Sequence, residues 1–241
     1  MKLKIAFFNL ILGVFLGFST QSLALMPITE QNSSALIKYY VEEYANILNH
    51  VQLSNNTSYM LGQTAVSDSC ISLINKDLIL GRVGHSIYSE LTKNSSLYPF
   101  LMEGGKIKNH CKNYSTMDNN QRAVVWLLVL TTMAHFESSC NSAAKAKGPN
   151  GTAYGYFQLH KGKEFLYAGA PFICPKNASL SPMQSSKCAL GMLEKQMDRT
   201  TGELFSNKSY WEVLRPKGPA DKAKHISKAI ARSSLCNPKT M

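Results

Sequence analysis

The sequence predicts a mainly α-helical fold with a small β element, cross-linked by disulfides. Three observations carry this prediction: residues 119–138 hold a long apolar run, Ser181 and Pro182 open a second helical segment, and six cysteines follow an N-terminal export signal. A helix that is apolar on all sides is buried in a protein core. An even number of cysteines in an exported chain indicates disulfides. We therefore expect a disulfide-stapled α+β protein with a helical core.

Residues 1–24 have the features of a signal peptide. Lys2 and Lys4 precede an apolar run from Ile5 to Phe18, and Ser22-Leu23-Ala24 offers small residues for cleavage. A membrane anchor is the alternative, but the apolar run is short for a bilayer. We therefore expect an exported protein, periplasmic or secreted, with no stable membrane anchor.

The mature chain is basic. The formal net charge is +11, and it falls to +9 when the leader takes away Lys2 and Lys4. Basic exported proteins favour anionic partners such as acidic polysaccharides, nucleic acids or membrane surfaces. The sequence has no nucleic-acid motif, and its cations are dispersed apart from a group near the C-terminus (Lys217, Lys222, Lys224 and Lys228) that is typical of a solvated helix face. We expect a monomer with no nucleic-acid partner.

The first half of the mature chain gives only local signals. Residues 36–48 have apolar side chains at helical spacing, which predicts an amphipathic helix. Residues 70–91 suggest one or two short helices, interrupted near residues 81–84. The mostly polar stretch 109–120 suggests a long loop.

The central helix is the strongest structural prediction. Asp118 is a suitable N-cap for a helix over residues 119–138, and residues 123–130 are all apolar. The run is too short to span a membrane, so the helix is expected in the protein core. Its C-terminal end places Glu137 at the edge of that core.

Three further segments follow the central helix. Residues 141–163 suggest a loop with short strand content around Tyr154 to Leu159. Ser181-Pro182 begins a helix that reaches about Arg199 and ends near Gly202. Residues 219–233 suggest a last helix.

The six cysteines all lie in the mature chain: Cys70, Cys111, Cys140, Cys174, Cys188 and Cys236. Six cysteines allow 15 pairings, and the sequence does not choose among them. A local bridge between Cys174 and Cys188 is the first expectation.

Glu137 is the candidate catalytic residue. A carboxyl beside apolar surface has its charged form disfavoured, so its pKa rises and it can serve as a general acid. The alternative is a structural glutamate held by a salt bridge or a hydrogen bond. The loop that follows is rich in glycine, tyrosine and glutamine, and tyrosine and glutamine are the residues that stack on sugars and hydrogen-bond to them.

Glu137-Ser138 and the segment Ala-Tyr-Gly-Tyr-Phe-Gln-Leu over residues 153–159 resemble the signature of the soluble lytic transglycosylase and goose-type lysozyme superfamily. The resemblance covers roughly residues 119–235. It implies a lysozyme-like catalytic domain over residues 119–241, preceded by an N-terminal helical extension over residues 25–118 whose role is open. It also implies that Glu137 protonates the bond between N-acetylmuramic acid and N-acetylglucosamine in peptidoglycan, without a metal or an organic cofactor.

The same resemblance supplies candidate sugar-binding residues. The family usually carries an Ala-Tyr-Asn-Ala-Gly-like segment in its last third, which is absent here, and Tyr210 is the candidate for the missing tyrosine. The substrate-binding residues implied in this way are Ser138, Tyr154, Gly155, Tyr156, Gln158 and Tyr210.

Two outcomes of catalysis are open. The chain has no Asp or Glu between Glu137 and Glu164, which favours a transglycosylase that uses one glutamate and releases 1,6-anhydro products. Hydrolysis by a lysozyme usually uses a second carboxylate, and Glu164, Glu194 or Asp198 could supply it.

Two other classes of function fit the sequence less well. A non-catalytic, exported peptidoglycan-binding protein would have no need of a carboxyl at the end of an apolar helix. A zinc deaminase would combine His135-Phe136-Glu137 with a Pro-Cys-x-x-Cys motif, which the sequence lacks.

Overall fold

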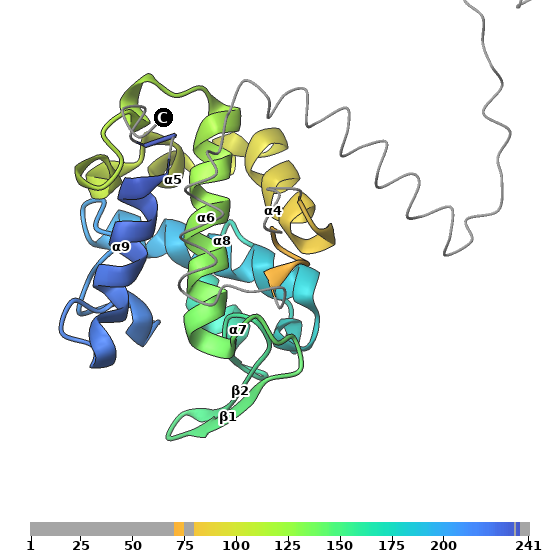
Figure 1. Ribbon diagram of the computed structural model, residues 1–241. Coiled ribbons are helices and arrows are strands. Elements are labelled where there is room, and N and C mark those ends of the chain that lie inside the picture. Colours follow the sequence, from red (N-terminus) through yellow and green to blue (C-terminus); the bar gives the residue numbers. More distant parts are fainter. Residues whose placement is uncertain (1–69, 75–79, 234, 237–241) are drawn as a thin grey trace, which may run out of the picture. The chain divides into compact units, whose positions relative to one another are not determined.

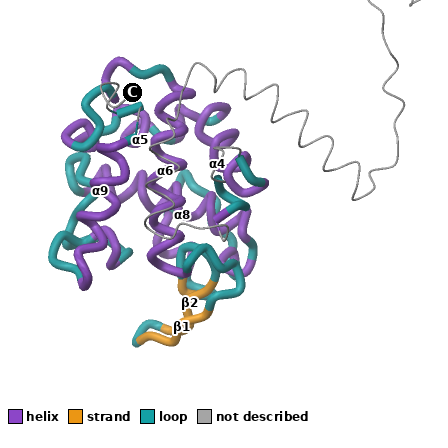
Figure 2. Tube along the Cα trace, viewed as in Figure 1, coloured by secondary structure: helices purple, strands orange, loops and turns teal. Residues whose placement is uncertain are grey.

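The computed structural model describes residues 70–74, 80–233 and 235–236. The predicted signal peptide and the predicted helix over residues 36–48 lie outside these residues. Figure 1 shows α6 in the middle of the described part, with α4 and α9 on opposite sides and a small β-hairpin beyond its C-terminal end. Figure 2 shows that the described part is mainly helical and that its strands gather at the β-hairpin. The predicted α+β class is confirmed.

The described α-helices are α4 (Arg82–Lys93), α5 (Pro99–Glu103), α6 (Asn119–Ser138), α7 (Glu164–Ala168), α8 (Pro182–Arg199) and α9 (Lys222–Arg232). The short 3-10 helices are η2 (Ser95–Leu97), η3 (Gly105–Asn109), η4 (Tyr114–Thr116), η5 (Ala178–Leu180), η6 (Glu212–Leu214) and η7 (Pro219–Asp221). Strands β1 (Lys145–Gly148), β2 (Gly151–Tyr154) and β3 (Leu159–His160) form one antiparallel sheet in the order β1-β2-β3.

Helix α6 begins and ends where the sequence predicts. Asp118 accepts a hydrogen bond from the Gln121 backbone at 2.8 Å, and the Gln121 side chain accepts one from the Asp118 backbone at 3.0 Å. This capping box satisfies two backbone donors at the start of the helix. Every residue from Ala123 to Ala134 is buried, as a helix without a polar face requires.

The core is built around α6. Helices α4, α5 and α9 and the short η6 all pack against it. Trp126 is fully buried, and its indole nitrogen donates to the Leu101 carbonyl and the Tyr114 hydroxyl, both at 2.8 Å. Buried side chains from residues before and after position 119 belong to the same apolar cluster.

Helix α8 also follows its predicted bounds. Pro182 is the first helical residue, and the Ser181 hydroxyl accepts a hydrogen bond from the Gln184 backbone. The last helix is α9, which begins at Lys222, three residues after its predicted start, because Pro219–Asp221 forms the 3-10 helix η7 instead.

Two local predictions need correction, and a third is confirmed in part. Tyr154 and Leu159 lie in strands, at the end of β2 and the start of β3, but residues 155–158 between them form a turn. The predicted loop over residues 109–120 contains η4 and a fully buried Tyr114. Residues 70–74 form a turn rather than a helix, and α4 begins only at Arg82. Gly84 therefore lies inside the helix instead of interrupting it. A Cβ at Gly84 would stand 1.8 Å from the Leu73 carbonyl oxygen.

All six cysteines are paired. The bridges are Cys70–Cys140, Cys111–Cys236 and Cys174–Cys188, so the expected local bridge is confirmed. Three disulfides indicate an oxidising compartment. No helix in the described ranges is long and apolar enough to cross a membrane.

Glu194 is a structural carboxylate. It lies on α8 with 5% of its surface exposed, and it accepts hydrogen bonds from the backbone amides of Phe100 at 2.8 Å and Leu101 at 2.9 Å. These amides stand at the start of α5, where no intrahelical acceptor exists for them. Glu194 therefore fixes α5 to α8.

We expect Glu194→Ala to lower the free energy of unfolding by roughly 2–4 kcal/mol, because two buried amide donors lose their acceptor. Urea unfolding measures the change. Glu103→Ala is the matched control, since Glu103 is exposed at the end of α5. Equal effects of the two substitutions would refute the structural role of Glu194.

Candidate active site

Glu137 lies in the last turn of α6, where the core meets the surface. The first two residues after the helix, Ser139 and Cys140, both have left-handed backbone conformations, with φ of 53° and 55°. The chain therefore turns sharply away from the helix axis after the glutamate. The bridge from Cys140 to Cys70 fixes this turn to the segment that precedes α4.

The Glu137 side chain lines a cleft of about 260 Å³. The other lining residues are Ala146, Lys147, Gly148, Ala153, Gln158, His160, Tyr210, Trp211 and Glu212. They come from the β-hairpin with the turn and strand that follow it, and from the segment that leads into η6. Two stretches that are distant from each other in sequence thus meet around one carboxyl.

Burial raises the pKa of Glu137 to about 7, and the negative charge of Glu212 acts in the same direction. The charges of Lys222 and Arg215 and the backbone amide of Val213 oppose this shift but do not cancel it. A carboxyl with a pKa near 7 is protonated in about half of the molecules at neutral pH. Glu137 can therefore donate a proton and can also accept one.

The Gly-Tyr-Phe-Gln segment forms the turn over residues 155–158, and its first and last residues make that turn possible. Gly155 has φ of +71°, and a Cβ there would stand 2.8 Å from the Ser179 carbonyl oxygen. Gln158 also has a left-handed backbone, and its side-chain amide donates to the Gly155 carbonyl at 2.8 Å. Gln158 thus closes the turn and lines the cleft, whereas Gly155 approaches protein backbone and is not among the lining residues.

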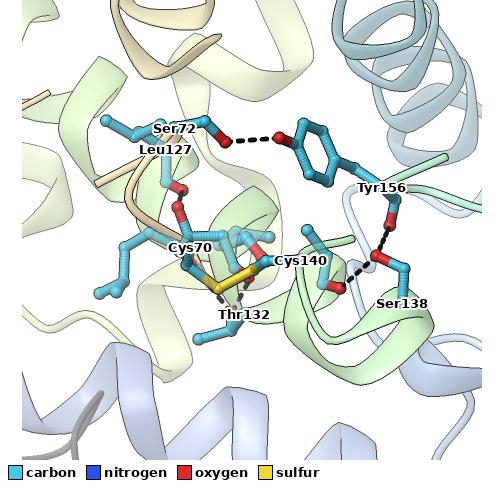
Figure 3. Close-up of a disulfide and its surroundings, with 11 residues drawn as sticks. Cys70, Ser72, Leu127, Thr132, Ser138, Cys140 and Tyr156 are labelled. Atoms are coloured by element: carbon cyan, nitrogen blue, oxygen red, sulfur yellow. Dashed lines mark hydrogen bonds between the residues drawn. A yellow bond between two sulfur atoms is a disulfide. The ribbon is translucent and has the colours of Figure 1, made fainter. Parts of the chain in front are cut away.

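Ser138 and Tyr156 hold this turn against α6, as Figure 3 shows. The Ser138 hydroxyl lies 2.9 Å from the Ala134 carbonyl oxygen and 3.1 Å from that of Tyr156. The Tyr156 hydroxyl lies 2.5 Å from the Ser72 hydroxyl, and the tyrosine is 6% exposed. Neither Ser138 nor Tyr156 is among the residues that line the cleft.

Tyr154 lies at the end of β2, outside the set of lining residues. Its ring is flanked by the ammonium groups of Lys145 and Lys161, at 5.6 and 5.7 Å from the ring centroid. Such cation–π contacts keep the ring beside the hairpin.

The structure brings Tyr210 into the cleft. Its hydroxyl lies 2.7 Å from the His160 Nδ1 and 3.1 Å from the Gln158 carbonyl oxygen, and it accepts a hydrogen bond from the His160 backbone at 3.1 Å. The neighbouring Trp211 donates from its indole nitrogen to the Phe157 carbonyl at 2.8 Å. These bonds join the segment before η6 to the Gly-Tyr-Phe-Gln turn.

His160, Glu212 and Lys147 are lining residues with polar chemistry that sequence reasoning missed. His160 directly follows the motif over residues 153–159, and this position in the sequence could have identified it as a site residue. Burial lowers the pKa of His160, and the charge of Lys163 lowers it further. Glu212 carries no sequence signal, because only the packing of η6 on α6 brings it beside Glu137.

The acids proposed from the sequence as a second carboxylate do not line the cleft. Glu164 is fully buried and accepts backbone hydrogen bonds from Asn177 and Ser179 at 3.2 and 3.1 Å. Glu194 anchors α5, and Asp198 lines a different cavity. The second acid in the cleft is Glu212, which is exposed.

Across the described ranges, no group of three or more His, Cys, Asp or Glu side chains is arranged to hold a metal ion.

The raised pKa of Glu137 implies a cost in stability. The folded protein holds this proton up to about pH 7, whereas an ordinary glutamate releases it near 4.5. Wild type therefore loses stability between these two pH values, and above pH 7 the full cost is about 3 kcal/mol. We expect Glu137→Gln to gain about that much relative to wild type between pH 4 and pH 8, as measured by urea unfolding. The exposed-site variant Glu103→Gln should not show this pH dependence, and a pH-independent difference for Glu137→Gln would contradict the raised pKa.

No family model matches the chain, and no curated protein matches it. Three solved structures of DslA, a Bdellovibrio protein, are similar to it, with sequence identities of 22, 23 and 24%. Each match covers 64% of this chain and 90% of DslA, with TM-scores of 0.53, 0.53 and 0.52. One of these structures is wild type, and the other two carry glutamate-to-glutamine substitutions at different positions. The likeness shows that the chain shares a lysozyme-like fold with DslA.

Proposed function

We propose that this protein is an exported enzyme that cleaves the bond between N-acetylmuramic acid and N-acetylglucosamine in peptidoglycan, as a lytic transglycosylase. The observation that carries the proposal is Glu137, a carboxyl with a pKa of about 7 in a cleft at the end of a buried helix. A general acid works best when its pKa lies near the operating pH. The three disulfides fit a periplasmic or secreted location.

In the proposed reaction Glu137 first acts as an acid. Its proton passes to the oxygen that joins the muramyl C1 to the next sugar, and the bond between C1 and that oxygen breaks. The Glu137 carboxylate then accepts the proton of the muramyl C6 hydroxyl, whose oxygen bonds to C1. The product is a 1,6-anhydro sugar, no water is consumed, and Glu137 regains its proton.

The environment of Glu137 suits both halves of this cycle. Burial favours the neutral acid, while Lys222, Arg215 and the Val213 amide favour the carboxylate. The opposing influences leave the two forms nearly equal in free energy at neutral pH. A group balanced in this way loses little driving force in either direction of proton transfer.

The remaining cleft residues have proposed roles in substrate binding. Tyr210 and Gln158 both line the cleft together with Glu137 and are the proposed sugar contacts there. Tyr154 lies at the rim of the hairpin. Ser138, Gly155 and Tyr156 contribute by shaping the turn that carries Gln158.

Hydrolysis is the second candidate, and Glu212 is the observation that favours it. This carboxyl shares the cleft with Glu137 and is exposed to water. In inverting glycosidases a second carboxylate activates a water molecule on the other face of the sugar. A lysozyme-type reaction with Glu137 as acid and Glu212 as base would give reducing muropeptides.

Mass spectrometry of products from purified peptidoglycan tests the proposal. We expect wild type to release muropeptides one water lighter than reducing muropeptides, and Glu137→Gln to lower the rate at least about 1,000-fold, since the general acid is lost. Glu103→Gln is the control carboxyl variant, because Glu103 is exposed and does not line the cleft. Release of the same products by Glu137→Gln at the wild-type rate would refute the catalytic role of Glu137, and no release by wild type would favour a peptidoglycan-binding protein.

Glu212→Gln separates the two outcomes. Under transglycosylation the variant continues to make anhydro products, whereas under hydrolysis it loses most of its activity, because no base activates water. Reducing muropeptides from wild type, lost in Glu212→Gln, would replace the transglycosylase proposal with the lysozyme proposal.

The pH profile gives an independent check. We expect kcat/KM to fall as pH rises through about 7, because Glu137 must be protonated to act as the acid. Glu212→Gln should move this midpoint to lower pH, since the charge of Glu212 helps to raise the pKa of Glu137. A profile that stays flat between pH 5 and pH 9 would contradict the role of Glu137.

A further inference from the structure

A second, larger cavity adjoins the cleft. Its volume is about 610 Å³, and it shares His160 and Tyr210 with the cleft. The hydrogen-bonded pair of His160 and Tyr210 therefore forms the wall between the two spaces. A polymer seated in the cleft could place a side group across this wall.

The second cavity is strongly cationic. Four of its lining residues are Lys195, Arg199, Lys208 and Arg215, and none of its lining residues is acidic. Within the described ranges, none of the four forms a salt bridge with a carboxylate; the salt bridges found there are Lys106–Glu203 and Lys187–Glu90. The cavity thus gathers positive charge that no salt bridge among the described residues neutralises, and the charge of Arg215 also acts on Glu137 in the adjoining cleft.

Two hydrogen bonds to backbone carbonyls fix the guanidinium of Arg215. Its Nε donates to the Ser209 carbonyl at 2.9 Å and one Nη donates to the Tyr210 carbonyl at 3.3 Å. A guanidinium has five N–H donors in a fixed plane, so donors remain after these two bonds. Because its plane is already fixed, little entropy is lost when those donors bind a carboxylate.

We propose that this cavity binds the carboxylates of the peptide stem carried by the muramyl sugar. The inference rests on the proposed function, because it needs a peptidoglycan strand in the cleft. The stem is joined to the muramyl lactyl group through an amide, so the glycan backbone is uncharged and the free carboxylates belong to the peptide. Carboxylates are therefore the groups of this substrate that match the four cations of the cavity, none of which forms a salt bridge within the described residues.

The apolar part of the cavity suits the same ligand. Tyr167 and Met192 line it together with Leu166, and they offer surface to the aliphatic carbons of a peptide. The ring of Tyr167 lies 4.7 Å from that of Tyr210, so this surface begins next to the wall. A simple inorganic anion would have no use for it.

The binding test uses Glu137→Gln protein and two synthetic stem tetrapeptides. One has the order Ala, γ-linked Glu, diaminopimelate and Ala with free carboxylates, and the other has the same residues with every carboxyl amidated. We expect the acidic peptide to bind at least about tenfold more tightly than the amidated one, since charge-assisted hydrogen bonds are lost on amidation. Equal affinities would overturn the proposal.

Charge variants locate the site. The double substitution Arg199→Gln with Lys208→Gln, added to the same protein, removes two exposed cations of the cavity and should weaken binding of the acidic peptide about tenfold. The control pair is Lys224→Gln with Lys228→Gln, which removes the same charge from the exposed side of α9. An equal loss in the control would mean non-specific attraction and would overturn the site. A phosphate-bearing cell-wall polymer that binds at these residues more tightly than the peptide would also overturn it.

A separate assay keeps this inference distinguishable from the proposed function. Wild type is given glycan strands from which an amidase has removed the peptides. Absence of cleavage here and with intact peptidoglycan counts against the proposed function, while peptide binding that depends on Arg199 and Lys208 would still support the cavity. Cleavage without such binding would support the enzyme and refute the cavity.

Discussion

The burial of α6 is the constraint on which the rest of the structure depends. A helix with no polar face must be enclosed, and α4, α5, α9 and η6 enclose it. The one place where such a helix can carry a charged group is its end, and Glu137 stands there in the last turn. The enclosing segments leave its carboxyl partly desolvated, which raises its pKa to about 7. The partial negative charge at a helix C-terminus acts in the same direction. The architecture of the core thus produces the chemistry of the site.

Links between distant segments then fix the surroundings of Glu137. The Cys70–Cys140 bridge holds the turn after α6, and Trp211 donates to the Phe157 carbonyl to hold the segment before η6 on the motif turn. Loops that carry functional groups need such support, because a site held loosely loses its geometry. The cleft walls therefore belong to elements that are covalently or hydrogen-bonded to the core.

The parts of the fold that the sequence predicted are those with local causes. The capping residues of α6 and α8 and the apolar run of α6 lie within the helices they define, so their bounds were predictable. The turn over residues 155–158, which separates the strand residues Tyr154 and Leu159, was not predicted, because the left-handed backbone of Gln158 is stabilised by its own side chain and has no sequence signal. In the site, Glu137 was predictable from the helix that carries it. Glu212 was not, because its place depends on tertiary packing of η6.

The two carboxyls of the cleft differ in the property that separates an acid from a base. Glu137 is desolvated and keeps its proton near neutral pH, whereas Glu212 is exposed, and its negative charge contributes to the raised pKa of Glu137. An acid beside an ionised carboxylate is the arrangement that glycosidases use. Hydrolysis requires that a water molecule activated by the base reaches the anomeric carbon. Transglycosylation does not, because the attacking C6 hydroxyl is already part of the sugar. The outcome therefore depends on whether the bound glycan seals Glu212 and its water from C1. Since the walls around Glu137 come from the hairpin and from Tyr210, the fit of the sugar between them decides between an anhydro product and a reducing one.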